Sequence, residues 1–577
     1  MTPSRLFTSV MILTMVGILQ LPGVFAQDSA LVIRDITLVN PGEKPAGNQT
    51  IVIQGDKIRD VGLSGEIAIP DAAHIIEGKG KYAIPGLIDT HVHFFQSGGL
   101  YTRPDIIDLR SRVPYQQELQ RIRNELPETF RRYLRSGVTA VADVGGPMWN
   151  FEVRRRARQS SRAPLVTVAG PLISTYQPQA LTTGDPPIIK PPSIDSARSL
   201  VRAQVQQGAD YIKIWYIVRS GDPSKHLELV SAAIDEAHRH NKPVLVHATE
   251  LTTARAAVEA GADALVHSVT DTVVTDSFAQ LLKKNDVIYT PTLTVFESYP
   301  EVFSQQIDLT LEEHRWSDPE VISSLFDLSK MPADSLPRFI QNAMKQKDKV
   351  TTDQEALKNL KLLYNAGVTI AAGTDAGNIG TPHGPAIYRE FELMRQAGLS
   401  PSEILETATI NGARFMGKEK DLGSIREGKL ADLLVLEKNP LEDIKNTGSI
   451  YRVIKNGESH NPEQLLESSP AKVVQRQVNA YNARDIEGFA SFYSEDIRIY
   501  AHPKQLRFSG RDTLYARYKT QFESNPKQHA AIQKRIVLGN HVFDRERVTG
   551  LSRNGPIQAV AHYVIENGKI QEVYFTH

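Results

Sequence analysis

The chain has 577 residues, of which 41% are hydrophobic and 23% charged, and it contains no cysteine. This length predicts two or three domains, and the absence of cysteine excludes disulfides and thiolate metal ligands. The 66 basic and 66 acidic residues balance, so the overall charge gives no sign of nucleic-acid or anionic-membrane binding, and a small neutral or zwitterionic partner is expected.

The first 26 residues have the pattern of a cleavable secretory signal peptide. Arg5 precedes the apolar stretch VMILTMVGIL, and VFA stands directly before Gln27. An uncleaved anchor helix is the alternative, but the apolar stretch is short for a membrane span of roughly 20 residues. We therefore expect an exported protein, periplasmic or secreted, without stable membrane insertion after cleavage.

Two patterns follow one another along the next 400 residues. Residues 27–84 contain short β-rich runs such as LVIRDITLV between Gly, Pro and Asn turns, which predicts a small β domain. From residue 85 apolar strands alternate with helical stretches, and the expected strands are 86–93, 138–145, 165–170, 211–215, 243–248, 264–268, 287–293 and 368–376. This alternation is typical of a parallel α/β sheet, and eight units predict a (β/α)8 TIM barrel over residues 85–423. A doubly wound open sheet is the alternative.

Polar side chains occur near the C-terminal ends of several of these apolar strands. They are His91, His93, Lys213, His247, His267 and Asp375. In a barrel these strand ends converge on one mouth, whereas in an open sheet they would be spread over many strand spacings of nearly 5 Å each. A shared site therefore favours the barrel.

The residue types in this set predict a metal site. His91 and His93 are two positions apart on one strand, so both point to the same face, and two imidazoles there suit a divalent ion. His247, His267 and Asp375 add nitrogen and oxygen donors for which zinc is the first choice, although Mn, Co or Fe fit the same donors. Lys213 stands between two isoleucines, where an unpaired ammonium would be costly to bury.

Six motifs carry a resemblance to a known family. They are PGLIDTHVH, GADYIKIW, LVHAT, LVHS, GTDAG and GSIREGKLADLLVLEKNPLEDI. Over roughly residues 30 to 460 the chain resembles the amidohydrolase superfamily of metal-dependent hydrolases. Within it the chain is most similar to the branch with imidazolonepropionase-like proteins, prolidases and Xaa-Arg/Lys carboxypeptidases.

The resemblance implies a centre with two divalent metal ions, zinc being preferred. His91, His93 and Asp375 would hold one ion and His247 and His267 the other. Lys213, carbamylated by CO2, would bridge the ions, because burial favours the neutral amine that reacts. A hydroxide between the ions would attack a carboxamide, and Asp375 would pass a proton to the leaving nitrogen.

The expected substrate is a dipeptide or another N-acyl amino acid, with His383, Tyr289 and Arg103 as candidate substrate contacts. Lactones, phosphotriesters and other specialised amides stay open as substrates for the same kind of centre. A weakly active, metal-containing binding protein is the alternative from a different class.

The flanking segments predict further units. The strands of residues 27–84 are expected to join residues 424–458 in a β-sandwich that supports the barrel. The segment SHNPEQLLESSP, residues 459–470, is a polar linker. Residues 471–577 resemble the SnoaL-like, or NTF2-like, α+β cone, for which dimerisation or substrate capture is expected, and a homo-oligomer stays open.

Overall fold

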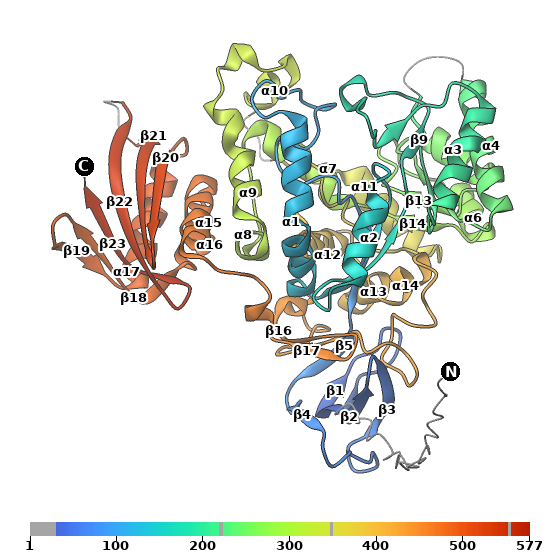
Figure 1. The fold of residues 1–577 in the computed structure, drawn as a ribbon, viewed down its shortest axis with the longest axis horizontal. Coiled ribbons are helices and arrows are strands. Elements are labelled where there is room, and N and C mark those ends of the chain that lie inside the picture. The colour runs from blue at the N-terminus through green and yellow to red at the C-terminus, as the bar shows by residue number, and fades with distance from the viewer. Residues whose placement is uncertain (1–29, 219–222, 347–349, 552–554, 577) are drawn as a thin grey trace, which may run out of the picture.

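The computed structural model describes residues 30–218, 223–346, 350–551 and 555–576. The signal peptide expected at residues 1–26 lies outside the described residues. Figure 1 shows three parts: a sheet near the N-terminus, a central α/β body and a C-terminal α+β unit. No helix in the described ranges combines the length and the apolar character that a membrane crossing needs.

The first part is a sheet that both flanks of the central body build. Within the described residues it has eight strands in the order β17-β16-β15-β5-β1-β2-β3, with β4 paired to β1. The strands are β1 (Leu31–Leu38), β2 (Ala46–Gln54), β3 (Lys57–Leu63), β4 (His74–Glu77), β5 (Tyr82–Pro85), β15 (Leu433–Leu436), β16 (Ile450–Lys455) and β17 (Glu458–His460). The antiparallel pairing of β15 with β5 joins segments that lie far apart in the chain.

The central body contains two parallel sheets. One has the order β6-β7-β8 and the other β10-β9-β11-β12-β13-β14. The strands are β6 (Leu87–Val92), β7 (Val138–Asp143), β8 (Leu165–Val168), β9 (Leu172–Ser174), β10 (Ile188–Ile189), β11 (Ile212–Trp215), β12 (Val244–His247), β13 (Ala264–Val266) and β14 (Ile288–Thr290). Every residue of β6, β7 and β11 is buried, as expected for parallel strands that are covered on both faces.

The expected closed barrel of eight regular strands is only partly present. Seven of the expected strands form, but residues 368–376 do not form a regular strand. That segment instead forms isolated backbone hydrogen bonds with β14 and with the end of β6. Tyr289 N donates to Thr369 O at 2.9 Å, and His93 N donates to Ala376 O at 2.8 Å. Between β8 and β11 no ladder joins the two sheets in the described part of the chain, so the ring is open there.

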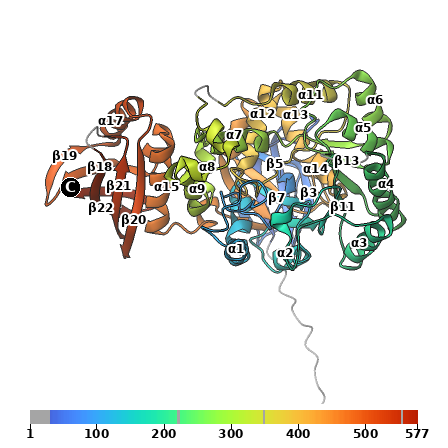
Figure 2. The ribbon, with the colours of Figure 1, turned by 90° about the horizontal axis from the view of Figure 1, so that it is seen from above.

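Helices surround these sheets (Figures 1 and 2). They are α1 (Tyr115–Arg135), α2 (Asn150–Arg158), α3 (Ile194–Gln206), α4 (Pro223–Arg239), α5 (Leu251–Glu259), α6 (Asp276–Lys284), α7 (Leu293–Ser304), α8 (Leu311–Trp316), α9 (Pro319–Leu325), α10 (Arg338–Ala343), α11 (Gln354–Asn365), α12 (Ala386–Gln396), α13 (Pro401–Thr407) and α14 (Ile410–Phe415). Short 3-10 turns lie at Gln179–Leu181, Phe326–Lys330, Ala333–Ser335, Ile444–Gly448 and Pro462–Gln464. The start of helix α3 is marked by a local sequence signal, because Ser193 and Ser196 form a capping box there.

The C-terminal unit packs helices against one face of an antiparallel-rich sheet. Its strand order is β19-β18-β23-β22-β21-β20. The elements are α15 (Pro470–Ala483), α16 (Ile486–Ala490), β18 (Tyr493–Ala501), β19 (Gln505–Ser509), α17 (Arg511–Ser524), β20 (His529–Leu538), β21 (His541–Thr549), β22 (Ile557–Glu566) and β23 (Lys569–Thr576). Figure 2 shows α8 and α9 between α15 and the central body, and Asn479 on α15 donates a 2.8 Å hydrogen bond to the carbonyl of Pro319 on α9.

Candidate metal centre

Three of the expected ligands meet where β6 ends and the irregular segment 368–376 returns to it. Potential ligand atoms of His91, His93 and Asp375 all lie within 4.8 Å of one another. The Nε2 atoms of His91 and His93 lie 3.4 Å and 3.3 Å from Asp375 Oδ1. Because the side chains of the two histidines point to the same face of the strand, both imidazoles can contact the same metal ion.

The other two histidines stand beside this group. The imidazole rings of His247 and His267 are 4.3 Å apart between centroids, and those of His91 and His267 are 4.7 Å apart. His267 Nδ1 lies 3.8 Å from Asp375 Oδ2, so the carboxylate faces histidines on two sides. Adjacent parallel strands β12 and β13 place the two rings next to each other.

Lys213 is the most unusual residue of the centre. It lies in β11, its side chain is 1% exposed, and its Nζ has no hydrogen-bond partner among the described residues. Burial lowers the pKa of Lys213 to about 7, and the negative charge of Asp375 only partly opposes this shift. A sizeable fraction of the amine is therefore neutral near neutral pH.

The donors of this centre fit a divalent cation. Both ring nitrogens of His91, Nζ of Lys213 and Oδ1 of Asp375 are buried without a hydrogen bond in the described part of the chain. Such unsatisfied groups are rare in folded proteins, and several in one place call for a ligand. Burial also lowers the pKa values of His91, His247 and His267, which keeps these imidazoles neutral with free lone pairs.

A backbone carbonyl and a side-chain hydroxyl hold two of the rings in position. His93 Nδ1 lies 2.7 Å from the carbonyl oxygen of Gly145. The turn that presents this carbonyl is held by Asp143 at the end of β7, which accepts hydrogen bonds from the backbone N–H of Gly145 at 3.2 Å and of Phe94 at 3.3 Å. His267 Nδ1 lies 2.8 Å from the hydroxyl of Thr292. Such supporting contacts orient the ligand rings.

Two of the candidate ligands occupy a backbone conformation that non-glycine residues seldom adopt. The φ angles of His267 and Asp375 are 89° and 60°. Positive φ at such residues stores strain, and it is often found where a side chain must be aimed at a site. His267 directly follows β13, and Asp375 lies at the end of the segment 368–376 beside β6, so both positions are where the chain leaves its strand neighbours.

A cavity of about 410 Å³ opens beside the ligands. His93, Lys213, His247, His267 and Asp375 line one part of it, and its apolar wall includes Phe95, Leu172, Ile188, Trp215, Val295 and Phe296. This volume is in the usual range for small-molecule sites. Arg103 also lines the cavity, where it is paired with Asp105 and donates to the side-chain oxygen of Asn378.

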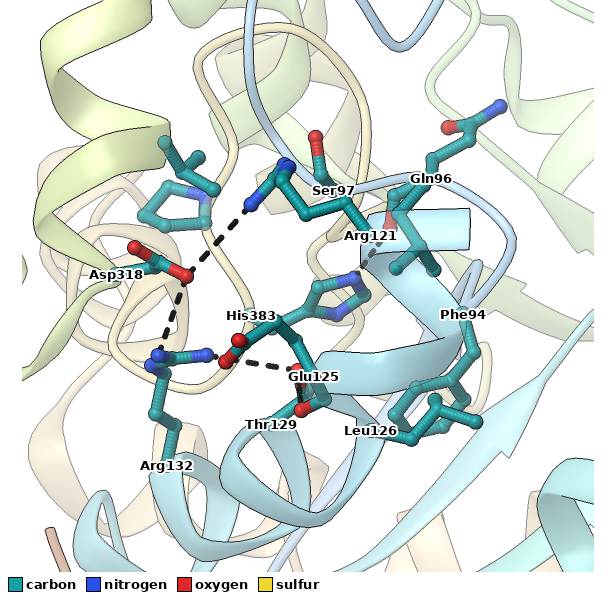
Figure 3. Close-up of a pocket in the computed structure, with 13 residues that line it drawn as sticks. Phe94, Gln96, Ser97, Arg121, Glu125, Leu126, Thr129, Arg132, Asp318 and His383 are labelled. Atoms are coloured by element: carbon teal, nitrogen blue, oxygen red, sulfur yellow. Dashed lines mark hydrogen bonds and ion pairs between the residues drawn. The ribbon is translucent and has the colours of Figure 1, made fainter. Parts of the chain in front are cut away.

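His383 and Tyr289 lie elsewhere and do not line this cavity. His383 faces a small neighbouring pocket between α1 and the loop after β6 (Figure 3), where its Nδ1 lies 2.7 Å from the Tyr133 hydroxyl and its Nε2 2.8 Å from Gln96 O. Tyr289 is fully buried, and its hydroxyl accepts a 2.9 Å hydrogen bond from Val269 N. Both residues hold backbone near the site.

Other residues of the site were not anticipated from sequence. Asp143 is one, although the motif VADVG shows an acidic residue at the end of an apolar strand, as the ligand strands do. Asp89 is another: its carboxylate accepts from the Thr374 hydroxyl at 2.7 Å and from the Thr374 N–H at 3.0 Å, tying β6 to the segment that carries Asp375. Trp215 follows Lys213 with the same side-chain direction, because strand positions alternate between faces.

Comparison with known proteins identifies the family. The model of the Amidohydrolase family matches residues 82–459, which is more than half of the chain. The chain belongs to the amidohydrolase family. A second model, the SnoaL-like domain, matches residues 474–573. The expected resemblance is thereby confirmed, and the protein is a hydrolase of a metal-dependent superfamily that acts on a small molecule.

Individual relatives of this amidohydrolase are distant. An ochratoxinase of Aspergillus niger is 26% identical over 445 residues, covering 71% of this chain and 81% of that protein. An imidazolonepropionase of Fusobacterium nucleatum is 24% identical over 442 residues, covering 70% and 90%. The crystal structure of a Xaa-Pro dipeptidase with bound methionine superposes with a TM-score of 0.58 at 24% identity, covering 75% of this chain and all of that one. This structural likeness supports the α/β barrel architecture of the central body.

Proposed function

We propose that the protein is an exported binuclear amidohydrolase that cleaves a carboxamide bond in a dipeptide or another N-acyl amino acid. The observation that carries this proposal is the buried Nζ of Lys213, which has no hydrogen-bond partner in the described residues and lines the same cavity as the histidines and Asp375. A single metal ion held by His91, His93 and Asp375 would not require it. A second ion and a carbamylated lysine account for both the lysine and the pair His247 and His267.

The chain supplies ligands for two ions. His91, His93 and Asp375 would hold one, His247 and His267 the other, and Lys213 carbamylated by CO2 would contribute an oxygen to each. Zinc suits these nitrogen and oxygen donors. Divalent ions bound there would acidify a water molecule and polarise the scissile carbonyl.

The residues around this centre have separate tasks in the reaction. Asp375 lies 3.3–3.8 Å from ring nitrogens of His91, His93 and His267, and it can accept a proton at one carboxylate oxygen and deliver it to the departing nitrogen. Glu250 and Thr249 follow His247 at the cavity wall and offer polar contacts for the free end of a substrate.

The apolar wall favours one kind of acyl or side-chain group. Trp215, Phe296 and Phe95 present aromatic surface to the cavity. Burying aromatic or branched groups against them contributes binding free energy in proportion to the buried area. A substrate with a bulky apolar group on one side of the amide is therefore preferred, and the relatives named ochratoxinase and Xaa-Pro dipeptidase support an amide substrate.

The first test is amino-acid release from a library of dipeptides and N-acyl amino acids. The purified protein is reconstituted with zinc and bicarbonate, and chelator-treated protein is the control. Release that needs metal and is confined to one residue class supports the proposal and defines the pocket's preference. Metal-dependent cleavage of lactones or phosphotriesters instead of amides would show that the proposed amide substrate is wrong. The absence of metal-dependent turnover with every substrate would favour a binding protein.

The second test addresses Lys213 itself. Lys213→Ala should be inactive, and propionate should restore part of the activity, because a small carboxylate can enter the vacated space and supply two oxygens. Lys213→Met is the matched control, since its side chain fills that space and should prevent rescue. Full activity of Lys213→Ala without any added carboxylate would contradict the proposed role of this residue.

A further inference from the structure

The C-terminal unit encloses a cavity of its own. It has a volume of about 200 Å³ and shares no lining residue with the cavity beside the candidate metal ligands. Helix α15, helix α17 and the inner face of the sheet surround it, and its lining includes Gln477, Tyr481, Tyr493, Tyr518, Glu546 and Tyr563. This volume suits a small organic molecule rather than a peptide.

A carboxyl group stands at the wall of this cavity without a cationic partner. Glu546 on β21 is 6% exposed and forms no ion pair with any described residue, although it accepts a 2.8 Å hydrogen bond from the Tyr563 hydroxyl. The neighbouring guanidinium of Arg535 is engaged with Asp544, to which its Nε and Nη2 donate at 2.7 Å and 2.6 Å. Burial raises the pKa of Glu546 to about 7. A buried carboxylate of this kind is stabilised when a cation is bound beside it.

A second acceptor lies on the helix side of the same cavity. Gln477 on α15 is 5% exposed, and its Oε1 is buried with no hydrogen-bond partner in the described part of the chain. An unsatisfied buried acceptor costs free energy unless a donor reaches it. Gln477 and Glu546 can therefore both accept hydrogen bonds from a molecule bound in the cavity.

Aromatic rings complete the lining. Tyr481 and Tyr518 meet at 6.4 Å between centroids, and Phe489 behind them contacts Tyr518 at 4.5 Å and Tyr493 at 5.0 Å. The faces of such rings carry partial negative charge and attract organic cations. Arg507 lines the cavity from the exposed strand β19, so a cationic group is favoured at the Glu546 end and disfavoured near this arginine.

We propose that the cavity of the C-terminal unit binds a small protonated organic amine, whose ammonium group donates to Glu546 and Gln477 while its apolar body packs against the tyrosine rings. The amine has one cationic end and a body of about the size of a phenyl ring. This assignment does not depend on the reaction at the metal centre, since no residue is shared between the two cavities.

The test compares ligands that differ only in charge. Isothermal titration calorimetry of the full chain with zinc, at pH 8 and thus above the raised pKa of Glu546, measures binding of phenethylamine, 2-phenylethanol and 3-phenylpropionate. Phenethylamine should bind at least tenfold more tightly than the alcohol, and the carboxylate should bind least. Equal affinity for amine and alcohol, preference for the carboxylate, or no binding of the amine up to 10 mM would each overturn the proposal; these comparisons need no variant.

Two variants then locate the site. Glu546→Gln keeps the shape and the bond from Tyr563 but removes the charge, so affinity for phenethylamine should fall about tenfold while affinity for the alcohol is unchanged. Glu572→Gln is the matched control, because Glu572 pairs with Arg498 at the surface and does not line the cavity. Melting temperatures verify that both variants fold. Unchanged amine binding in folded Glu546→Gln would place the amine elsewhere and refute the assignment.

Discussion

His93 Nδ1 lies 2.7 Å from the carbonyl oxygen of Gly145, and this contact determines which nitrogen of the ring is available to a metal. A carbonyl oxygen can only accept, so Nδ1 carries the proton and Nε2 has the free lone pair. Nε2 is the atom that lies 3.3 Å from Asp375 Oδ1. A backbone carbonyl thus sets the tautomer and the aim of a ligand.

Asp143 should matter for metal binding although it touches no ligand side chain. Asp143→Asn alters the carboxylate that holds Gly145 N and Phe94 N, so the carbonyl facing His93 is less well fixed. We expect metal affinity to fall about 10- to 100-fold, measured by competition with a zinc chelator. Asp432→Asn is the control: this equally buried aspartate pairs with Lys455 in the eight-stranded sheet, and its loss should lower stability with metal affinity unchanged. Equal metal affinity in Asp143→Asn and the wild type would contradict the positioning role.

Removal of metal should destabilise the central body. The buried donors that lack hydrogen bonds then have no partner, and bound zinc at 100 times its dissociation constant contributes about 2.7 kcal/mol of stability. Differential scanning calorimetry with zinc and with chelator should show a higher melting temperature for the zinc form, and the transition of the C-terminal unit should be unaffected. An unchanged profile would speak against a metal at these residues.

Lys213→Met should separate stability from metal content. An apolar side chain of similar length removes the cost of burying an amine, so the chelated protein is expected to be as stable as the wild type or more stable. Zinc bound per chain, measured by elemental analysis, should fall from two toward one. Two tightly bound zinc ions in Lys213→Met would show that the lysine is no bridge.

Trp215 should set the preference for bulky groups. Trp215→Ala removes aromatic surface from the cavity wall, and kcat/KM for substrates with an aromatic group is expected to fall about tenfold or more, mainly through a higher KM. Trp215→Phe, which keeps a ring, should recover most of this loss. A uniform decrease in kcat for large and small substrates alike would indicate a disturbed metal centre instead.

The pocket in Figure 3 provides a pH-dependent prediction. Asp318 lies 3.3 Å from Arg132 and 3.7 Å from Arg121; burial alone would raise its pKa, but these positive charges outweigh burial and lower the pKa below its ordinary value of 3.8. A lowered carboxyl pKa stabilises the fold above the ordinary value, and this contribution is lost as the pH falls through the lowered pKa.

Asp318→Asn should therefore destabilise the protein most at neutral pH. The loss is expected to be about 1–3 kcal/mol, because the buried Arg132 loses its ion pair with Asp318, while Asn still caps α9. The difference in melting temperature between variant and wild type should stay constant from neutral pH down to the ordinary carboxyl pKa of 3.8 and shrink only as the pH falls below that value. Asp108→Asn, in an exposed pair with Arg110, should change stability little at either pH. A difference that does not change with pH would mean that packing, not charge, explains the loss.

The sequence predicted the strands of the central body, and the clustering of the polar side chains at their ends, better than it predicted the ring's closure. Apolar runs that end in histidine are strong local signals, and seven expected strands form. The eighth does not, because Asp375 has positive φ and Gly373 approaches β6 so closely that a Cβ there would lie 2.8 Å from the His91 Cβ. Both features depend on contacts across the ring, which a local pattern does not contain.

Residues outside the strand ends were harder to assign for the same reason. His383 follows the GTDAG motif, which suggested a substrate contact, but Tyr133 on α1 and the Gln96 carbonyl occupy its two nitrogens. Arg103 does line the cavity, yet its pairing with Asp105 neutralises much of its charge. Such partners come from distant segments, so their effect on a side chain is visible only in three dimensions.

The irregular segment that returns to β6 also has a consequence for the order of folding. Asp89 and Thr374 are 285 residues apart in sequence, and their contact brings the first and last parts of the ring together beside the ligands. During synthesis all four histidines emerge well before Asp375, so a partly made chain holds an incomplete set of ligands. A metal ion held by His91, His93 and Asp375 would therefore bind with full affinity only after the two ends of the ring have come together, and it would then stabilise the contact between them.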